Sequence, residues 1–400
     1  IFCMCGESDP LTGVWRAVLS SSGGELPFIL EISAGDEHQY AAVVRNGDEA
    51  LPFSRVERSG SKVTFIFEHY DSIIEGELDP SGLVMTGEWS KRSRGERRSV
   101  MNFTARRGRN YRFTPLERAE EIDTGAEDIS GDWTAYFGEN PETHSHAVFH
   151  QEQDGRVTGT FMTTTGDYRF LEGTIERGVL RLSVFDGVHA YLFEAEVGGD
   201  GVMNGQFWSG MSGPVPWTAT KGGKDLPDPY SLTHLTNKEK KFRFSFPGVD
   251  GVVVSDDDER FEGKALLVYI FGTWCPNCND EAPLLVELYN EYNDRGLEVI
   301  GLANEYAGDF EKDSETVRKF SARYDITWPI LIVGPADKRR TQEALSDLDR
   351  VLAYPTTIFI DRSGEVYKIH TGFTGPGTGK YYEQLKMDFR QNIEEILANK

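Results

Sequence analysis

The sequence predicts a multidomain protein in which two tandem antiparallel all-β domains, barrel- or sandwich-like, are followed by an α/β domain. Three observations support this fold class. The chain has 400 residues, which is more than one ordinary hydrophobic core contains. Its first half consists of short β-type segments and repeats itself once. After about residue 240, predicted strands alternate with predicted helices, as in an α/β sandwich around a mixed sheet.

The composition narrows the classes of partner. The formal net charge is −23 at pH 7, which disfavours binding to nucleic acid and to anionic membrane surfaces. The sequence contains no run of about 18 apolar residues, so we expect no membrane-spanning helix in it. It contains only four cysteines, and such scarcity suits a protein whose reactive thiols work in oxidising surroundings.

Two of the four cysteines, Cys3 and Cys5, lie at the start of the sequence. Because the sequence begins at Ile1 and not at Met, we expect that an upstream segment has been removed. The first residues suit the end of a secretion signal or a lipid-attachment region. Phe2 and Met4 are larger than a lipoprotein cleavage site prefers, so a lipid anchor at either cysteine stays an open alternative.

The first predicted β domain covers residues 11–112. Short segments rich in β-branched and aromatic residues are separated by Gly, Asn-Gly and Asp-Pro-Ser-Gly turns. The predicted strands cover 14–19, 27–32, 40–45, 63–68, 72–78 and 83–89.

An internal repeat predicts the second β domain, at 129–222. Trp15 of copy one reappears as Trp133, 118 residues later, and several other positions match at the same shift. Near the end of each copy the shift falls to 114 residues, from Phe103 to Trp217, so copy one holds four extra residues.

The four extra residues fall within a basic loop at 91–98, which is either a solvated hairpin tip or a patch that docks a partner. An acidic connector at 114–129 joins the two β domains, and a Gly- and Pro-containing linker at 222–237 follows the second.

Three histidines of copy two raise the question of a metal site. Period-two spacing places them on one face of a strand, where imidazoles can hold a metal. The positions of copy one at a shift of 118 are all apolar, which favours a structural role, and we predict no metal site. The histidines are His144, His146 and His150, and the aligned residues are Leu26, Phe28 and Ile32.

The third predicted domain covers 237–400. Phe242, Phe244 and Phe246 alternate as in a strand, which a turn joins to a second strand at 252–254. The remaining predicted strands cover 265–271, 297–302, 329–333, 356–361 and 366–371. The predicted helices cover 281–292, 316–324, 338–348 and an amphipathic segment around 382–396.

The candidate active site is the stretch Cys275-Pro276-Asn277-Cys278, between the buried strand 265–271 and the helix that follows. Two cysteines separated by two residues at such a junction are typical of a redox dithiol. A helix N-terminus stabilises a thiolate, so Cys275 is expected to be the exposed attacking sulfur. Cys278 then lies one turn deeper and resolves a mixed disulfide.

Two structural interpretations of this pair are weaker. A structural zinc site needs four ligands, and no second Cys-x-x-Cys or His pair follows at finger spacing. An inert structural disulfide is the other alternative. We therefore expect no metal and no cofactor besides the redox-active Cys275–Cys278 disulfide.

Residues 240–400 resemble the periplasmic TlpA/ResA branch of the thioredoxin superfamily. Phe261-x-Gly263-Lys264 is similar to the lead-in of that branch. The stretch 274–278 with Glu281 and Pro283 resembles its Trp-Cys-x-x-Cys-x-x-Glu-x-Pro signature, and 354–364 resembles its cis-proline loop and hairpin. The duplicated β region has no counterpart in this resemblance.

The resemblance implies roles for the residues around the dithiol. Glu281, one helical turn beyond Cys278, would move protons and tune the thiol pKa, although the helix dipole alone favours a glutamate there. The loop with Pro355 would face the dithiol and pair with an extended substrate segment. The residues expected to contact the substrate are Trp274, Pro276, Asn277, Tyr354 and Pro355.

The resemblance also implies a function. A thiol:disulfide oxidoreductase of this branch reduces disulfides of exported client proteins, apocytochrome c among them, with electrons from a membrane thiol carrier. We expect a periplasmic or cell-envelope protein whose β domains dock the client or a partner. A disulfide oxidase or isomerase stays open, as does a binding protein whose β repeats capture a ligand. A peroxiredoxin-like peroxidase is disfavoured, because Thr273 lies two residues before Cys275 instead of three.

Overall fold

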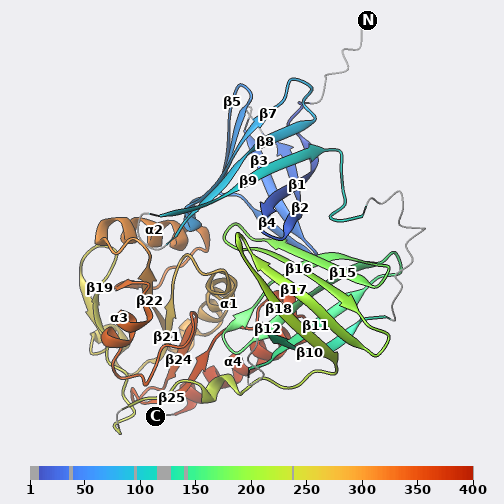
Figure 1. The fold of residues 1–400 in the computed structure, drawn as a ribbon. Helices are drawn as coiled ribbons and strands as arrows, with labels where there is room; N and C mark the ends of the chain where they lie inside the picture. The colour runs from blue at the N-terminus through green and yellow to red at the C-terminus, as the bar shows by residue number, and fades with distance from the viewer. Residues whose placement is uncertain are drawn as a thin grey trace, which may run out of the picture. The chain divides into compact units, whose positions relative to one another are not determined.

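The computed structural model describes residues 9–35, 39–93, 97–114, 128–138, 143–236 and 238–399 (Figure 1). Cys3, Cys5 and most of the acidic connector lie outside these residues. The chain divides into two compact units. Unit 1 comprises Ile1–Arg92, Arg98–Gly159 and Phe170–Gly223, and unit 2 comprises Ser93–Arg97, Thr160–Arg169 and Lys224–Lys400.

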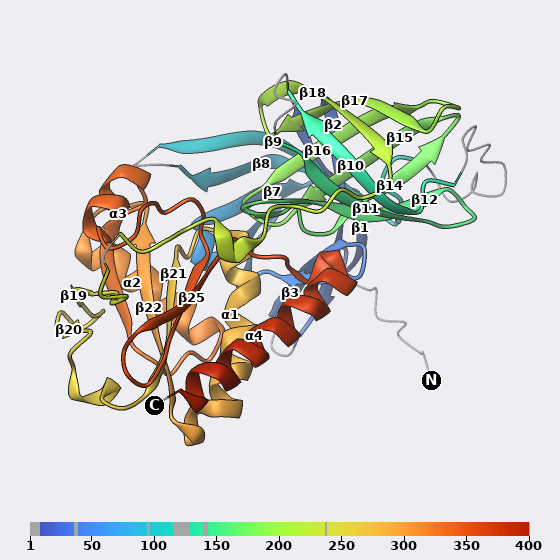
Figure 2. The ribbon, with the colours of Figure 1, turned by 90° about the horizontal axis from the view of Figure 1, so that it is seen from below.

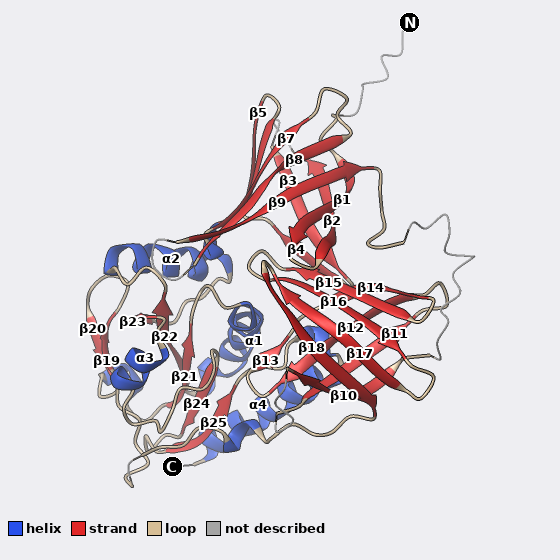
Figure 3. Ribbon diagram, in the orientation of Figure 1, coloured by secondary structure: helices blue, strands red, loops and turns tan. Residues whose placement is uncertain are grey.

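The first β region forms a closed, barrel-like antiparallel sheet (Figure 3). The strand order is β2-β1-β9-β8-β7-β6-β5-β3-β4, and a further pairing of β2 with β3 closes the ring. β4, β5 and β9 had not been predicted from the sequence. The strands are β1 Gly13–Ser21, β2 Gly24–Ala34, β3 Tyr40–Asn46, β4 Glu49–Pro52, β5 Arg55–Ser59, β6 Lys62–Phe67, β7 Ser72–Leu78, β8 Val84–Arg92 and β9 Arg98–Arg107.

The second β region has the same strand order, β11-β10-β18-β17-β16-β15-β14-β12-β13, closed by a pairing of β11 with β12. The two copies also share one side-chain hydrogen bond. Trp15 Nε1 donates to the Leu11 carbonyl at 2.9 Å, and Trp133 Nε1 donates to the Ile129 carbonyl at 2.8 Å. The strands are β10 Gly131–Phe137, β11 Ser145–Gln151, β12 Arg156–Thr163, β13 Gly166–Asp167, β14 Leu171–Glu176, β15 Val179–Phe185, β16 Ala190–Val197, β17 Val202–Ser209 and β18 Ser212–Lys221.

The strand register corrects the alignment of the histidines. Arg16 pairs with Ile29 in copy one, and Thr134 pairs with His146 in copy two, so His146 corresponds to Ile29 and not to Phe28. The hairpin that joins the first two strands differs in length by one residue between the copies. Such a one-residue shift of the alignment places each residue of the second strand on the opposite face of the sheet. His146 instead lies 2.9 Å from an Asp132 carboxylate oxygen through its Nε2.

A buried arginine joins strands of both sheets within unit 1. The Arg112 guanidinium donates to a Glu172 carboxylate oxygen at 3.0 Å, and its other nitrogens donate to the carbonyls of Pro27 and Arg45. Burial raises the pKa of Glu172, but Arg112, the Gly47 N–H and Arg156 outweigh that effect and hold it at about 2. Both members of the pair are therefore charged at neutral pH.

We expect Arg112→Met to lower the free energy of unfolding by about 3–5 kcal/mol, because it removes one partner of a buried ion pair. Urea denaturation followed by tryptophan fluorescence measures this change. Arg181→Met is the control, since the Arg181–Glu194 pair is 42% and 48% exposed and its loss should cost less than about 1 kcal/mol. Equal losses in both variants would contradict the assigned role of Arg112.

Unit 2 contains a five-stranded mixed sheet of order β23-β22-β21-β24-β25 among its described residues. β21 runs parallel to β22 and antiparallel to β24. The strands are β21 Ala265–Phe271, β22 Leu297–Glu305, β23 Ile330–Pro335, β24 Thr356–Ile360 and β25 Val366–Thr371. The helices are α1 Pro276–Tyr292, α2 Phe310–Arg323, α3 Lys338–Ala344 and α4 Lys380–Ala398.

Alternate residues of β21 face two separate cores, because successive side chains of a strand point to opposite faces. The odd-numbered residues from Ala265 to Phe271 pack with side chains of α1, α2 and α4. The even-numbered residues pack with Phe242, Phe244 and Leu345. Figure 2 shows α4 running along the sheet on the side where α1 lies. All seven residues of β21 are buried, as its apolar sequence had indicated.

Several predicted elements of this region were wrong in extent. The helices predicted at 281–292 and 316–324 begin earlier, at Pro276 and Phe310. The strand expected from Phe242 is only β19 Ser245–Pro247, which pairs with β20 Val253–Ser255. Phe242 and Phe244 are buried all the same, and an alternating apolar pattern does not by itself require strand pairing. The helix expected at 338–348 ends at Ala344. No helix of the described residues is long and apolar enough to cross a membrane.

Candidate active site

The dithiol lies where β21 passes into α1. Cys275 has extended backbone angles (φ −94°, ψ 117°) and is the N-cap of α1, and Pro276 is the first helical residue. Proline suits this position because its missing N–H would have no helical partner. Cys275 is 8% exposed, Cys278 is fully buried, and both are free thiols. The sulfur at the helix N-terminus is thus the more accessible of the two, but it is buried in this structure, whereas the sequence had predicted an exposed Cys275.

The loop before β24 meets the dithiol. The Cys275 thiol donates to the Tyr354 carbonyl at a distance of 3.3 Å, and the Tyr354–Pro355 peptide bond is cis. The Pro355 carbonyl accepts a hydrogen bond from the Gly372 N–H. The sequence had placed this proline loop opposite the dithiol, and the contact with Cys275 agrees.

Cys278 is held as a neutral thiol. Burial and a hydrogen bond with Cys275 raise its pKa well above the ordinary value. The Tyr269 hydroxyl donates to the Cys278 carbonyl at 2.7 Å, which ties the first turn of α1 to β21. Because Cys278 does not ionise readily, its attack on a disulfide requires a base.

Glu281 is the nearest candidate for that base. It lies one turn beyond Cys278 on α1 and is fully buried. One carboxyl oxygen accepts a hydrogen bond from the Thr357 hydroxyl at 2.7 Å, and the other has no hydrogen-bond partner. Burial raises the pKa of Glu281 to about 8, against a smaller opposite effect of Thr357. The group is therefore poised to exchange a proton near neutral pH.

Aromatic side chains form the rim of the site. Trp274 Nε1 donates to the Asn304 carbonyl at 2.9 Å, and its ring stacks on Tyr306 with centroids 4.4 Å apart. The Tyr354 ring meets Trp274 edge-on at 5.7 Å. Pro276 is buried, and Asn277 is partly exposed. The residues expected to contact the substrate thus gather around Cys275.

A second buried carboxylate, Glu305, was not anticipated. Its oxygens accept hydrogen bonds from the Thr273 N–H at 2.9 Å and from the Thr273 hydroxyl at 2.6 Å. Burial raises the pKa of Glu305 to about 8. A signal was present in the sequence: Glu305 ends an apolar parallel strand, and functional groups gather beyond the carboxyl ends of such strands.

The structure brings another unanticipated residue, Arg169, to the first turn of α1. Its guanidinium lies 2.8 Å from a carboxylate oxygen of Asp280 and donates to the Pro276 carbonyl at 3.1 Å. Nothing in the local sequence around Arg169 indicates this contact, because more than 100 residues separate the partners.

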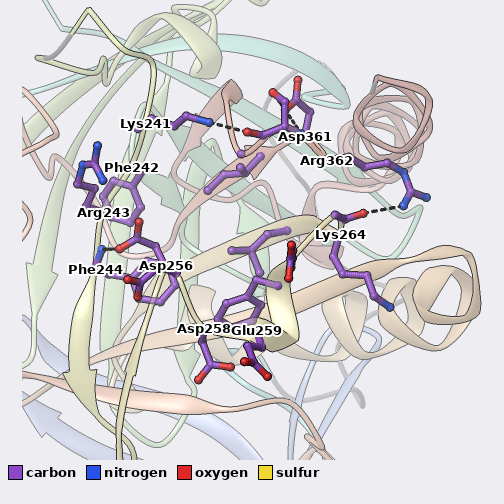
Figure 4. A pocket seen from close by; sticks show the side chains of 18 residues that line it. Lys241, Phe242, Arg243, Phe244, Asp256, Asp258, Glu259, Lys264, Asp361 and Arg362 are labelled. Atoms are coloured by element: carbon purple, nitrogen blue, oxygen red, sulfur yellow. Dashed lines mark hydrogen bonds between the residues drawn. The ribbon is translucent and has the colours of Figure 1, made fainter.

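A separate hollow of about 370 Å³ lies at the other end of β21, beside Lys264 and Leu266 (Figure 4). Three of its charged side chains bind other groups of the protein. Lys241 donates to the Ser363 carbonyl, Arg362 donates to the Gly263 carbonyl, and an Asp256 oxygen accepts from the Phe244 N–H. These contacts fasten the segment that leads into β21.

The described residues contain no group of three or more His, Cys, Asp or Glu side chains that could hold a metal ion. A five-stranded mixed sheet with a free Cys-x-x-Cys pair at the N-terminus of α1 and a cis-proline loop against the first sulfur defines a thioredoxin-like thiol–disulfide oxidoreductase.

Comparison with known proteins narrows the class to a family. The sequence profile of the AhpC/TSA family matches residues 239–369. The chain is 36% identical over 116 residues to thiol-disulfide oxidoreductase ResA of Halalkalibacterium halodurans, covering 28% of this chain and 57% of that protein. It is 32% identical over 179 residues to ResA of Geobacillus kaustophilus, covering 45% and 80%. The chain belongs to the ResA-like thiol-disulfide oxidoreductases of the thioredoxin superfamily.

A solved structure shows similarity over the same part of the chain. The thiol:disulfide interchange protein of Chlorobium tepidum, a thioredoxin family protein, is 25% identical, with a TM-score of 0.31, and the match covers 40% of this chain and 95% of that one. The match with the first ResA spans little more than half of that protein's length. Proteins of this class work through the redox-active cysteine pair and need no further cofactor.

Proposed function

We propose that this protein reduces disulfide bonds of client proteins, with Cys275 as the attacking thiolate and Cys278 as the resolving thiol. The observation that carries the proposal is the difference between the two sulfurs. Cys275 sits at the helix N-terminus and is the more exposed, whereas Cys278 is fully buried beside Glu281. A dithiol of this kind separates the attacking from the resolving role.

In the first step the Cys275 thiolate attacks one sulfur of the client disulfide. A bond forms between Cys275 and that sulfur, the client S–S bond breaks, and the other client sulfur leaves as a thiolate that takes up a proton. The Tyr354 carbonyl, 3.3 Å from the Cys275 sulfur, marks the loop along which an extended client segment pairs. Trp274 and Asn277 border the same opening.

In the second step Glu281 accepts the proton of the Cys278 thiol. The Cys278 thiolate attacks the Cys275 sulfur, the second client sulfur leaves as a thiolate, and a Cys275–Cys278 disulfide forms. Two electrons have then passed from the cysteine pair to the client. A thiol donor must reduce the pair again before the next turnover, and we assign that task to a membrane thiol carrier.

The proposed clients are exported proteins, apocytochrome c among them, and the proposed location is the periplasm or cell envelope. The near absence of cysteines outside the dithiol and the family relationship support this choice. The proposed task of the two β barrels, which the family match does not include, is to dock the client or a partner. A lipid anchor at Cys3 or Cys5 would hold the protein at the membrane.

Alkylation and turnover test the proposal together. Iodoacetamide at pH 7 is expected to modify reduced Cys275 at least about tenfold faster than Cys278, because Cys278 is the more deeply buried and burial raises its pKa. Both cysteines lie in the tryptic peptide 265–295, so tandem mass spectrometry, which locates the label within that peptide, measures the two rates. Cys275→Ser is expected to reduce insulin no faster than buffer with dithiothreitol does. Equal labelling of the two cysteines, or an active Cys275→Ser variant, would refute the assignment.

A further inference from the structure

Residues 160–169 come from the second β region but belong to the same compact unit as the dithiol. This segment holds the end of β12, the two-residue β13 and Arg169. It borders the first turn of α1: a side-chain carbon added at Gly166 would lie 1.8 Å from the Asn277 amide nitrogen. A carbon added at Gly372, whose N–H binds the Pro355 carbonyl, would lie 3.0 Å from the Thr165 backbone. The segment therefore forms one wall of the site.

Arg169 fastens this wall to the helix. Its side chain is 5% exposed, and its guanidinium contacts both Asp280, itself 13% exposed, and the Pro276 carbonyl. A second contact lies beside it: an Asp167 carboxylate oxygen accepts from the Gly375 N–H at 2.5 Å. The residue itself has a left-handed backbone (φ 57°), and the Asp167 side chain accepts a hydrogen bond from its N–H. Such a conformation in a non-glycine residue persists only where surrounding contacts impose it.

We propose that Arg169 is a positioning residue for the dithiol, which holds the first turn of α1 and pairs with the Asp280 carboxylate. This inference rests on the proposed function and adds an electrostatic control to it. Asp280 lies on α1 two residues after Cys278 and five after Cys275. A negative charge there disfavours the Cys275 thiolate, and the buried guanidinium cancels that effect. The segment 160–169 thus sets the reactivity of the dithiol through one ion pair.

Other titratable groups also surround this turn. They are Cys278 and Glu281 of α1, Tyr269 of β21, Glu305 at the end of β22, Tyr324 after α2, Tyr354 of the cis-proline loop and Tyr382 of α4. All of these groups are retained when Arg169 or Asp280 is replaced. Differences between the variants therefore report on the ion pair itself.

The test uses the full chain and opposite charge changes in one pair. Arg169→Gln removes the cation of this ion pair and keeps the Asp280 carboxylate, and iodoacetamide should alkylate Cys275 about threefold more slowly at pH 7, with the pH midpoint displaced upward. Asp280→Asn leaves the Arg169 charge, and alkylation should be about threefold faster with the midpoint displaced downward. The double variant should return toward the parent profile, and Arg169→Lys, which keeps the charge, should stay near it.

A merely structural role would loosen the site in both single variants and move both profiles in the same direction. That outcome, or two profiles equal to the parent's, overturns the proposal. The matched control is the exposed Arg295–Glu394 pair at the far end of α1, where Arg295→Gln and Glu394→Gln should leave the profile unchanged. Insulin reduction by the parent is measured in parallel. A parent without activity refutes the proposed function. An active parent refutes only the role of Arg169 if the two single variants do not displace the pH profile of Cys275 alkylation in opposite directions.

Discussion

Cys278→Ser protein is expected to accumulate as a stable mixed disulfide between Cys275 and a client peptide. In the proposed mechanism Cys278 attacks the Cys275 sulfur within one helical turn, and well-oriented intramolecular attack carries a large advantage over attack by free thiol. A serine hydroxyl does not perform this step, so release of the client should slow by about 10³-fold or more. The adduct is quantified by mass spectrometry after mixing the reduced variant with a disulfide-bonded peptide.

Two comparisons make this experiment decisive. A Cys275→Ser, Cys278→Ser double variant should form no adduct, which shows that the trapped bond is to Cys275. Addition of dithiothreitol should release the peptide from the single variant. If the parent and Cys278→Ser release the peptide at the same rate, Cys278 does not resolve the mixed disulfide. If the double variant forms no adduct and dithiothreitol releases the peptide, proteins trapped by Cys278→Ser from an envelope extract are candidates for the natural client.

The second large effect is expected for Glu281→Gln, which removes the base beside Cys278. The resolving step should slow by roughly 10²-fold at pH 7, within the usual range for general base catalysis. In the parent this rate should rise with pH and level off above about 8, the pKa to which burial raises Glu281. In the variant only direct ionisation of Cys278 remains, and burial holds its pKa well above the ordinary value. Rapid-mixing measurements of mixed-disulfide decay distinguish the two profiles.

The same substitution predicts a change in stability. The pKa of Glu281 is higher in the folded chain, about 8, than the ordinary 4.5, so the folded state binds more protons between these values. The stabilisation of the folded state by the Glu281 proton is complete below about pH 4.5. It is lost as the pH rises through about 8, so the free energy of unfolding of the parent should fall over this range. Glu281→Gln should flatten this decline by a few kcal/mol. Glu305 shows the same pKa shift, so part of the decline should persist.

Glu305→Gln serves as the matched variant, because it flattens the decline of stability without removing the group beside Cys278. Its resolving step should keep the parent's pH profile. Superimposable decay profiles for Glu281→Gln and the parent would contradict the proton-transfer role. The glutamate would then be a buried residue that merely begins the helix.

The chemistry-bearing motif could be predicted because its pattern is local. Cys275 follows a seven-residue apolar strand and starts a helix, and both features depend on neighbouring residues only. The duplication was readable as well, since Trp15 and Trp133 keep one hydrogen bond and one strand position in both copies. The shift of 114 residues near the ends of the copies is also confirmed, because Ala105 pairs with Ala17 as Ala219 pairs with Ala135.

Contacts between distant residues were decided by the tertiary structure alone. The partner of Glu281 is Thr357, 76 residues away, and Arg169 reaches Pro276 across 107 residues. No periodicity or turn signal encodes such pairs, because they depend on the exact length of every intervening loop. The pairing of His146 with Thr134 illustrates this dependence, because a difference of one residue in hairpin length made the alignment of His146 with Phe28 wrong. The sequence by itself indicated the candidate dithiol, whereas packing decided which charges surround it, since burial and charge pairing exist only once the chain has folded.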